Sequence, residues 1–436
     1  MSAAFSFENL PDGWRPNTLG GLFDVQQGKA LSPEARGGVS RRPFLRTRNV
    51  LWGRLDLADV DTMSFDEGEA SRLTLQDRDL LVCEGGEIGR TAIWRDELPG
   101  CLYQNHIHRL RRKTDEVDPL FVMYWLQAAF LQLGLYEGIG NRTTIPNLSG
   151  ARLKSLPVPV PRVREQNAVA AILSKLHEAV ETMAGRVTAL KDLKAATMAR
   201  LFLCGLHGET TTDTELGPIP RSWGVVTLGE LCPGPIGTIQ TGPFGSQLHS
   251  SDYVESGIPI VNPTHIANGR IAQTRIPRVT DADASRLVRH RLQVGDILFS
   301  RRGDVGRHAY VGEREEGWLV GTGCLLVRPA PGAVNPKFLS YALDHGEVQA
   351  FLKTHAAGTI MPNINTRILS SVPIPVPAPP DQGPIADALS RLDASVESAE
   401  HRLSLLGNIF LTSLQSLTTG VLRVPPPLGS MEVPRV

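Results

Sequence analysis

The chain has 436 residues, of which 41% are hydrophobic and 21% charged, which is the composition of an ordinary folded protein. Lys and Arg together number 45, as do Asp and Glu, so net charge alone identifies no acidic or basic partner. The five cysteines are scattered and form no Cys-x-x-Cys pair, which argues against a zinc site or a disulfide framework and predicts a reducing, cytoplasmic location. The length allows two or three domains.

Residues 1–163 are predicted to form a mixed globular domain. Short apolar runs bounded by glycine, such as 79–83, predict strands, and 120–133 predicts a helix. This helix lies in an uncharged stretch, but its counterpart in the second half, a helix predicted over 337–352, carries Lys337 and Asp344. A membrane span would not be paired with a charged copy, so we expect a buried helix and no membrane partner.

A Pro-rich junction leads into a long amphipathic helix, predicted over 164–206. Prolines alternate with apolar residues at 156–161, which predicts a stiff extended arm because each proline fixes φ and lacks a donor. Glu165 and Gln166 follow, and an acid suits the start of a helix. Apolar residues then recur in a heptad seam. The seam consists of Leu176, Val180, Met183, Val187 and Leu190.

The second half of the chain repeats the first. Pro146 and Gln166 return as Pro362 and Gln382, each 216 residues later (362 − 146 and 382 − 166). The seam also returns with the same steps, as Leu392, Val396, Ala399, Leu403 and Leu406. A repeat of this length indicates tandem domains and not a solenoid.

The repeat sets the expected boundaries of the second half. We predict a second globular domain at 207–380, which opens with a linker at 207–218, and a second long helix at 381–422. A flexible tail is expected at 423–436. The two halves show no alignment between 25–70 and 236–290, which suggests one architecture that serves two recognition tasks.

No catalytic motif is present in the sequence. Phosphate-binding loops, His-Glu-x-x-His, Gly-x-Ser-x-Gly and the Asn/Asp-Pro-Pro-Tyr/Phe of amino-methyltransferases are all missing. His106 and His108 could share a strand face, but without a third ligand a structural or DNA-facing role is favoured over a metal site. The glycine clusters at 85–89 and 303–306 indicate tight turns rather than phosphate cradles. We therefore expect no catalytic residue and no metal.

Arginine-rich, acid-poor segments point to nucleic acid. Six arginines and no acid lie between Arg36 and Arg54, and further basic clusters occur at 109–113, 270–291 and 301–302. The guanidinium fork matches phosphate oxygens and the O6/N7 edge of guanine, whereas Asn and Gln match adenine. For any single arginine a solvated surface is the simpler explanation; for whole segments we favour DNA contact.

The repeat, the doubled Pro-rich junction, the segment Gly295–Ser300 and the two long helices together resemble a type I restriction–modification specificity subunit. The resemblance covers the chain from Pro11 to about Leu422. It implies an α+β fold with a pseudo-two-fold internal repeat. In that fold two tandem mixed α/β target-recognition domains (1–163 and 207–380) are separated by two long antiparallel coiled-coil helices.

The resemblance also implies a function. The chain would be a non-catalytic subunit that reads a bipartite, asymmetric site in double-stranded DNA, with one half-site per recognition domain. Its helices would dock two methyltransferase subunits and, where present, restriction subunits, with the seam residues other than Ala399 assigned to the subunit interface. No cofactor is expected in this chain; S-adenosylmethionine would belong to the methyltransferase, and ATP and Mg to the restriction subunit.

Base-contacting residues cannot be transferred by motif, so the DNA-contact prediction rests on residue chemistry and position. The predicted residues are Arg41, Arg42, Arg46, Arg48, Asn105, Arg109, Arg111, Asn141, Arg142, Thr143, Arg275, Arg278, Arg289, Arg301, Arg302 and Asn363. Two alternatives remain open: a stand-alone DNA nuclease with an unrecognised site, and a tandem-domain scaffold that binds proteins.

Overall fold

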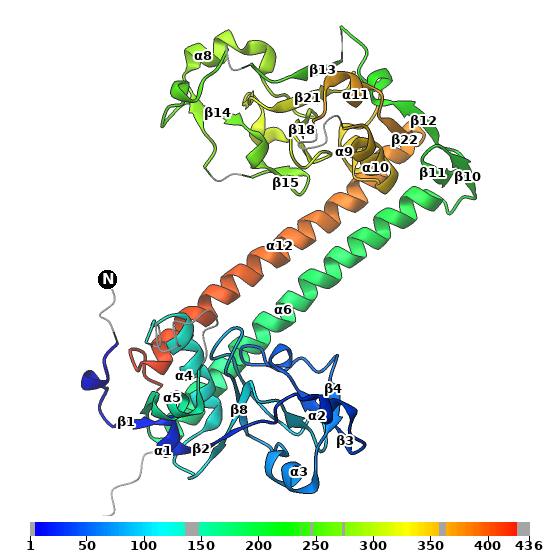
Figure 1. Cartoon of the computed structure of the whole chain (residues 1–436). Coiled ribbons are helices and arrows are strands. Elements are labelled where there is room, and N and C mark those ends of the chain that lie inside the picture. The colour runs from blue at the N-terminus through cyan, green and yellow to red at the C-terminus, as the bar shows by residue number, and fades with distance from the viewer. Residues whose placement is uncertain are drawn as a thin grey trace, which may run out of the picture. The chain divides into compact units, whose positions relative to one another are not determined.

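The computed structural model describes residues 5–135, 148–235, 237–244, 247–272, 275–356 and 363–424. The chain divides into two compact units (Figure 1). Unit 1 comprises Met1–Arg186 and Ala399–Val436, and unit 2 comprises Val187–Ser398. Both are mixed α and β, as predicted. None of the helices in the described ranges is long and apolar enough to cross a membrane.

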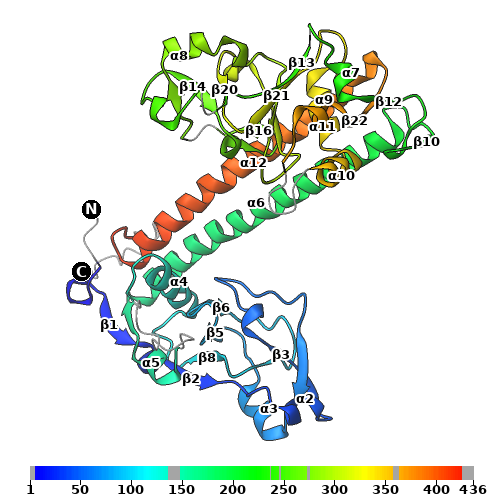
Figure 2. The ribbon, with the colours of Figure 1, turned by 45° about the horizontal axis from the view of Figure 1, so that its top comes forward.

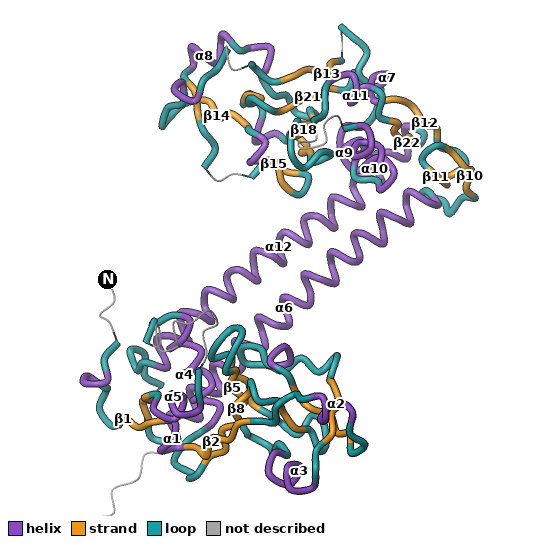
Figure 3. The backbone as a smooth tube through the Cα atoms, viewed as in Figure 1, coloured by secondary structure: helices purple, strands orange, loops and turns teal. Residues whose placement is uncertain are grey.

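Two long helices, α6 (Val163–Cys204) and α12 (Pro379–Thr418), each run from one unit into the other. In unit 1 the rings of His177 on α6 and Phe410 on α12 lie 5.3 Å apart, and Glu165 near the start of α6 pairs with Arg423, just beyond the end of α12. The helix segments in unit 1 are therefore antiparallel (Figure 3).

Unit 2 contains the matching arrangement. Lys194 on α6 lies 2.6 Å from Asp393 on α12, and His207 beyond the end of α6 lies 3.4 Å from Asp381 near the start of α12. These helix segments are antiparallel as well, so the predicted antiparallel pair is confirmed in each unit. The heptad seam is buried or half-buried along both helices, as an apolar seam between packed helices should be.

The globular part of unit 1 is built on two small sheets. The first has the antiparallel order β2 (Phe23–Gln27), β8 (Ile107–Arg112), β5 (Leu80–Cys83) and β6 (Thr91–Ile93) (Figure 2). The second has the order β4 (Asp61–Ser64), β3 (Arg41–Leu45) and β7 (Leu102–Tyr103), in which β3 and β7 are parallel. One apolar core lies between the sheets, and another surrounds the buried helix α4 (Pro119–Leu131).

Short elements complete unit 1. They are η1 (Phe7–Asn9), α1 (Leu19–Leu22), α2 (Pro33–Gly37), η2 (Thr47–Asn49), α3 (Glu67–Leu73) and α5 (Gly150–Ser155). The Pro-rich arm forms β9 (Pro157–Val160), which pairs only with β1 (Arg15–Thr18) in a two-stranded ribbon. A two-stranded ribbon tolerates the missing proline donors, which a central strand would not.

Unit 2 repeats this plan. Its four-stranded sheet has the order β13 (Thr238–Thr241), β21 (Cys324–Arg328), β18 (Ile297–Ser300) and β19 (His308–Tyr310). Its three-stranded sheet has the order β17 (Arg278–Val279), β14 (Ile258–Val261) and β20 (Leu319–Val320). The Pro-rich arm β22 (Pro373–Val376) pairs with β12 (Gly224–Thr227).

The remaining elements of unit 2 include two departures from the sequence predictions. The expected linker at 207–218 contains most of a hairpin, β10 (Thr211–Thr214) with β11 (Gly217–Pro220). The stretch 337–352, read as one helix, is two, α9 (Pro336–Leu343) and α10 (Gly346–His355). The other elements are α7 (Leu228–Leu231), η3 (Ser250–Asp252), η4 (Pro263–His265), β15 (Ile266–Ala267), β16 (Arg270–Ile271), α8 (Asp281–Arg286), η5 (Val288–His290), η6 (Glu313–Glu315) and α11 (Thr366–Ser370).

The segments 25–70 and 236–290, which could not be aligned by sequence, do contain equivalent structure. η2 and η4 are 216 residues apart (263 − 47), the same offset as the junctions. In η2 the Asn49 side chain accepts a hydrogen bond from the Arg46 N–H (2.9 Å), and in η4 the His265 ring accepts one from the Asn262 N–H (3.0 Å). The backbone turn is kept while the capping residue changes, so residue identity concealed the repeat.

The Gln of each junction attaches the globular domain to its long helix. The fully buried Gln166 side chain accepts a hydrogen bond from the Asp118 N–H at the start of α4 (2.7 Å) and donates to the Pro161 carbonyl (2.8 Å). Gln382 does the same with the Asn335 N–H (2.6 Å) and the Pro377 carbonyl (3.0 Å). An amide can both donate and accept, which this position requires.

Candidate nucleic-acid interface

The arginines of β3 and its neighbours in unit 1 are mostly engaged within the protein. Arg46 pairs with Asp61 (3.0 Å), and Arg48 lies 3.0 Å from Asp59 and 3.2 Å from Asp61. Arg41 donates to the Arg36 carbonyl (2.6 Å) and to the carbonyl of Thr62 (2.8 Å). The acid-poor stretch therefore receives its acids from β4 and the loop before it, which a local charge count cannot see.

One part of that stretch remains available. The exposed Arg36 and the partly exposed Arg42 have no side-chain partner within the described ranges. Between them Val39 is fully exposed (100%). A single exposed apolar residue is common on protein surfaces, so the free guanidinium groups, and not Val39, are what would suit a nucleic-acid partner. We name residues 36–42 the unit 1 tip. Arg41 and Arg42 there are among the predicted DNA contacts, whereas Val39 is not.

Arg109 and Arg111 of β8, predicted to contact DNA, serve the domain's interior instead. Arg109 is 4% exposed and pairs with Asp24 (2.5 Å). Arg111 makes a two-pronged contact with the buried Asp79 (2.8 and 2.6 Å), and this hydrogen bonding raises the pKa of Arg111. Unit 2 has the equivalent contact between Arg328 and Asp296 (both 2.6 Å). The pattern of two matched Arg–Asp pairs marks a structural role.

The other unit 1 predictions divide further. Asn105 is half-buried beside the end of β2, where its carbonyl accepts a hydrogen bond from Gln27 (2.9 Å). Asn141, Arg142 and Thr143 lie outside the described residues, as do Ile145–Asn147 of the junction motif and most of the predicted tail.

The two histidines near β8 differ in burial. His108 is buried, its Nε2 lies 3.2 Å from the Leu148 carbonyl, and burial lowers its pKa. The side chain of His106, by contrast, is exposed. Among the residues with described positions, no group of three or more His, Cys, Asp and Glu is arranged to hold a metal ion.

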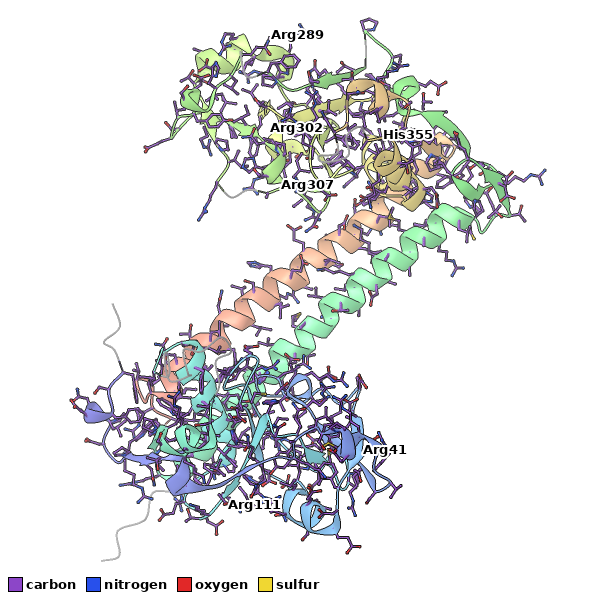
Figure 4. All side chains as sticks on the ribbon, viewed as in Figure 1. Arg41, Arg111, Arg289, Arg302, Arg307 and His355 are labelled. Carbon is purple, nitrogen blue, oxygen red and sulfur yellow. The ribbon has the colours of Figure 1, made fainter. Side chains whose placement is uncertain are left out.

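In unit 2 the predicted arginines separate into engaged and free groups. Arg278 donates to the Gly257 carbonyl (2.8 Å), and Arg301 donates to the Asn363 side-chain oxygen (3.2 Å). The exposed side chains of Arg275, Arg289 and Arg302 have no partner in the part of unit 2 that the structure describes. Arg289 and Arg302 are labelled in Figure 4.

Exposed apolar side chains accompany the free arginines of unit 2. Val288, next to Arg289, is 60% exposed, and Phe244 in the loop after β13 is 58% exposed. Residue type alone did not single them out, because an apolar residue in a sequence is expected to be buried. The position of Phe244 between Gly242-Pro243 and Gly245, residues that indicate a loop, is the sequence signal that could have found it.

The long helices expose a different apolar set from the one predicted. The seam residues assigned to the subunit interface, including Leu176 and Leu403, are buried or half-buried within their own units. The outer faces carry exposed apolar residues instead. These are Ile172, Leu193, Leu405, Ile409 and Leu411, which are 39–51% exposed.

Two copies of one mixed scaffold, each fixed to a long helix and each with its own set of free arginines, define a tandem two-domain recognition protein. A family model of the type I restriction modification DNA specificity domain matches residues 11–192 and again 220–406. The chain therefore belongs to this family.

Individual relatives agree with this assignment. The chain is 23% identical over 428 residues to the type I restriction enzyme MjaVIII specificity subunit of Methanocaldococcus jannaschii, covering 95% of this chain and 94% of that protein. It is 22% identical to the EcoBI specificity subunit of Escherichia coli, covering 95% and 85%.

Solved structures share the fold. The type I restriction–modification S subunit of M. genitalium superposes with a TM-score of 0.62 at 19% identity, covering 94% of this chain and 97% of that one. A chain from a study of complex assembly and conformational transition of the type I R-M system gives a TM-score of 0.51 at 17% identity, covering 95% and 100%.

Proposed function

We propose that this chain gives a type I restriction–modification enzyme its DNA sequence specificity, with the globular part of each unit reading one half of a split, asymmetric target. The observation that carries the proposal is the pairing of a conserved frame with non-equivalent free arginines. Unit 1 presents Arg42 at its tip, whereas unit 2 presents Arg275, Arg289 and Arg302. Different side chains on one frame read different base sequences.

Linking two readers gives useful specificity from few contacts. One good bidentate contact between a side chain and a base discriminates by about 1–3 kcal/mol, so one domain with a few contacts is a modest reader. Two linked domains bind the second half-site at high effective concentration, so the two discriminations combine. The long helices act as the spacer that fixes the distance between the half-sites.

The outer faces of the helices are the proposed docking surface for the other subunits. Leu193 and Ile409 are about half exposed, and neither belongs to the buried seam. We propose that two methyltransferase subunits dock on such residues, one for each repeat, and that restriction subunits complete the nuclease. S-adenosylmethionine would then bind to the methyltransferase, and ATP and Mg to the restriction subunit.

Modified-base sequencing of genomic DNA from the source cells, with and without this gene, tests the proposal. We expect deletion to abolish methylation at one two-part motif with a fixed gap, and restoration of the gene to return it. An unchanged methylome in cells that express the partner methyltransferase would contradict the proposal. Co-purification with unrelated proteins, with no salt-dependent DNA binding, would favour the protein scaffold instead.

A further inference from the structure

Each four-stranded sheet contains a strand, second in chain order, that is followed by an equivalent loop. The two loops differ in charge. In unit 1 the loop is 84–90, after β5, and in unit 2 it is 301–307, after β18. The Leu148 N–H donates to the Glu84 carbonyl (2.9 Å), and the Ile364 N–H donates to the Arg301 carbonyl (3.0 Å). This shared hydrogen bond makes Glu84 and Arg301 equivalent, and the positions that follow them are Gly85 and Arg302.

The first of these equivalent positions is tied to the protein in both units. Glu84 is 6% exposed and accepts a hydrogen bond from Gln27 (2.8 Å). Arg301 donates to the Asn363 side chain (3.2 Å). Glu84 is thus held by its carboxylate, and Arg301 is held by its Nε. The second position differs: unit 1 has no side chain there, and unit 2 has a guanidinium.

The backbone of Arg302 is held firmly while its side chain is free. The Ser300 hydroxyl donates to the Arg302 carbonyl (2.9 Å), and Arg302 forms a β-bridge with Asn363. Its exposed guanidinium has no hydrogen-bond or ion-pair partner among the residues described in unit 2. At the other end of the turn, the buried Nε of Arg307 also lacks a partner in the described structure. Figure 4 labels both arginines.

A guanidinium on a fixed backbone is suited to reading a base edge. Its planar fork presents two parallel donors, which match O6 and N7 of guanine in the major groove. Little conformational freedom of the main chain is lost on binding, because the strand end is already ordered. A mobile surface arginine would instead serve as a non-specific phosphate contact.

We propose that Arg302 determines specificity by reading a guanine in the half-site recognised by unit 2, and that Arg301 positions it through Asn363. This inference rests on the proposed function. Unit 1 has Gly85 at the equivalent position, so its half-site is read without this contact. The difference gives the two halves of the target different base requirements.

The test uses the complex of the full-length chain with its methyltransferase subunits and a randomised double-stranded DNA library. Sequences bound by the wild type, R302A and R314A are compared, together with the salt dependence of binding. Arg314 on η6 is the matched control, since it is also exposed and has no side-chain partner within the described part of unit 2. R302A replaces an exposed side chain and leaves the backbone hydrogen bonds of the strand end in place.

We expect R302A to lose selection for guanine at one position of one half-site, by about tenfold or more, which corresponds to one lost bidentate contact. The other half-site and the R314A profile should match the wild type. An unchanged motif with R302A would overturn the assignment. So would a uniform loss of binding with a smaller salt slope, which marks a phosphate contact. If the wild type selects no motif at all, the proposed function itself fails.

Discussion

Unit 1 and unit 2 hold their long helices together at equivalent positions but with different chemistry. In unit 1 His177 packs against Phe410, and in unit 2 Asp393 pairs with Lys194. His177 and Asp393 are equivalent in the repeat (393 − 177 = 216), and so are Lys194 and Phe410 (410 − 194 = 216). Ring packing and an ion pair thus occupy one structural position. The comparison shows that the repeat preserves where the helices meet rather than which interaction joins them.

The same lesson holds for the contact between each domain and its helix. Arg54 in unit 1 pairs with Glu181 on α6 (3.1 Å), and Arg270 in unit 2 pairs with Glu397 on α12. Both arginines lie in a short hairpin. In unit 1 this hairpin lies so close to α6 that a Cβ on Gly53 would be 2.2 Å from the His177 ring. Equivalent ion pairs thus attach each domain to a long helix in both units. The side chains that differ between the units are the ones available to bind DNA.

The largest expected effect comes from lengthening the helices. Inserting one heptad after Arg186 in α6 and another after Ser398 in α12 keeps the antiparallel register within each unit and adds about 10.5 Å, or about three base pairs, to the spacer. We expect a methylated motif whose half-sites are unchanged and whose gap is longer. Modified-base sequencing measures it, and an insertion in α6 alone is the control, which should abolish activity. An unaltered gap would show that the helices are not the spacer.

Removing the buried carboxylates tests the shared frame. Asp79 and Asp296 are each 1% exposed and hold Arg111 and Arg328. We expect D79A and D296A each to destabilise its own unit by about 3 kcal/mol, because a largely buried guanidinium loses its partner. Differential scanning calorimetry should show one shifted transition per variant. R112A, at an exposed pair with Asp115, is the control and should change little. A variant that lowers the transition temperatures of both units equally would show that the two units do not unfold independently.

Replacing single arginines of the unit 1 surface tests the division into free and engaged groups. We expect R42A to weaken DNA binding by the assembled enzyme about fivefold to tenfold at low salt, as the loss of one DNA contact would. R46A, which removes an arginine already paired with Asp61, should change affinity less. Fluorescence anisotropy with a target duplex measures both. A larger effect from R46A than from R42A would reverse the assignment.

Acid should weaken the helix contact of unit 1 through His177. Burial lowers the pKa of His177 below its usual 6.5, Arg54 lowers it further and Glu181 opposes the shift. The unfolded chain therefore binds the proton more readily, so this residue's contribution to stability is present above pH 6.5 and is lost as the pH falls through the folded pKa. Asp393 holds the equivalent position in unit 2.

The measurement is the urea midpoint of unit 1 at pH 7.5 and pH 5.5 for the wild type and H177Q. We expect the loss of stability on acidification to be smaller in H177Q than in the wild type. H106Q, at an exposed histidine, is the control and should keep the wild-type pH dependence. The same loss of stability in H177Q as in the wild type would show that protonation of His177 does not cause the acid sensitivity of unit 1.

The features of the fold that depend on local sequence could be predicted, and those that depend on contacts between distant residues could not. The long helices and the repeat follow from the heptad seam and from the doubled Gln166 and Gln382, because local periodicity and spacing are written in the chain. The middle of each domain did not align, since Asn49 and His265 cap the same turn with different chemistry.

The candidate site was predicted less well, for a physical reason. Whether an arginine is free depends on acids that folding brings to it, as Asp61 comes to Arg46 and Asp24 to Arg109. Arg42 and Arg302 were predicted among many arginines, but only the folded arrangement separates them from the engaged ones. The exposure of Val39 is likewise a property of the fold.

The most direct test of two independent readers is to make the two units the same. A chain in which residues 220–377 are replaced by a second copy of 11–161 keeps both junctions and both helices, because these boundaries are equivalent in the repeat. Modified-base sequencing of cells that express it with the methyltransferase should reveal a symmetric motif, with the half-site of unit 1 present twice as an inverted repeat. Methylation of the original asymmetric motif by this chain would contradict the account.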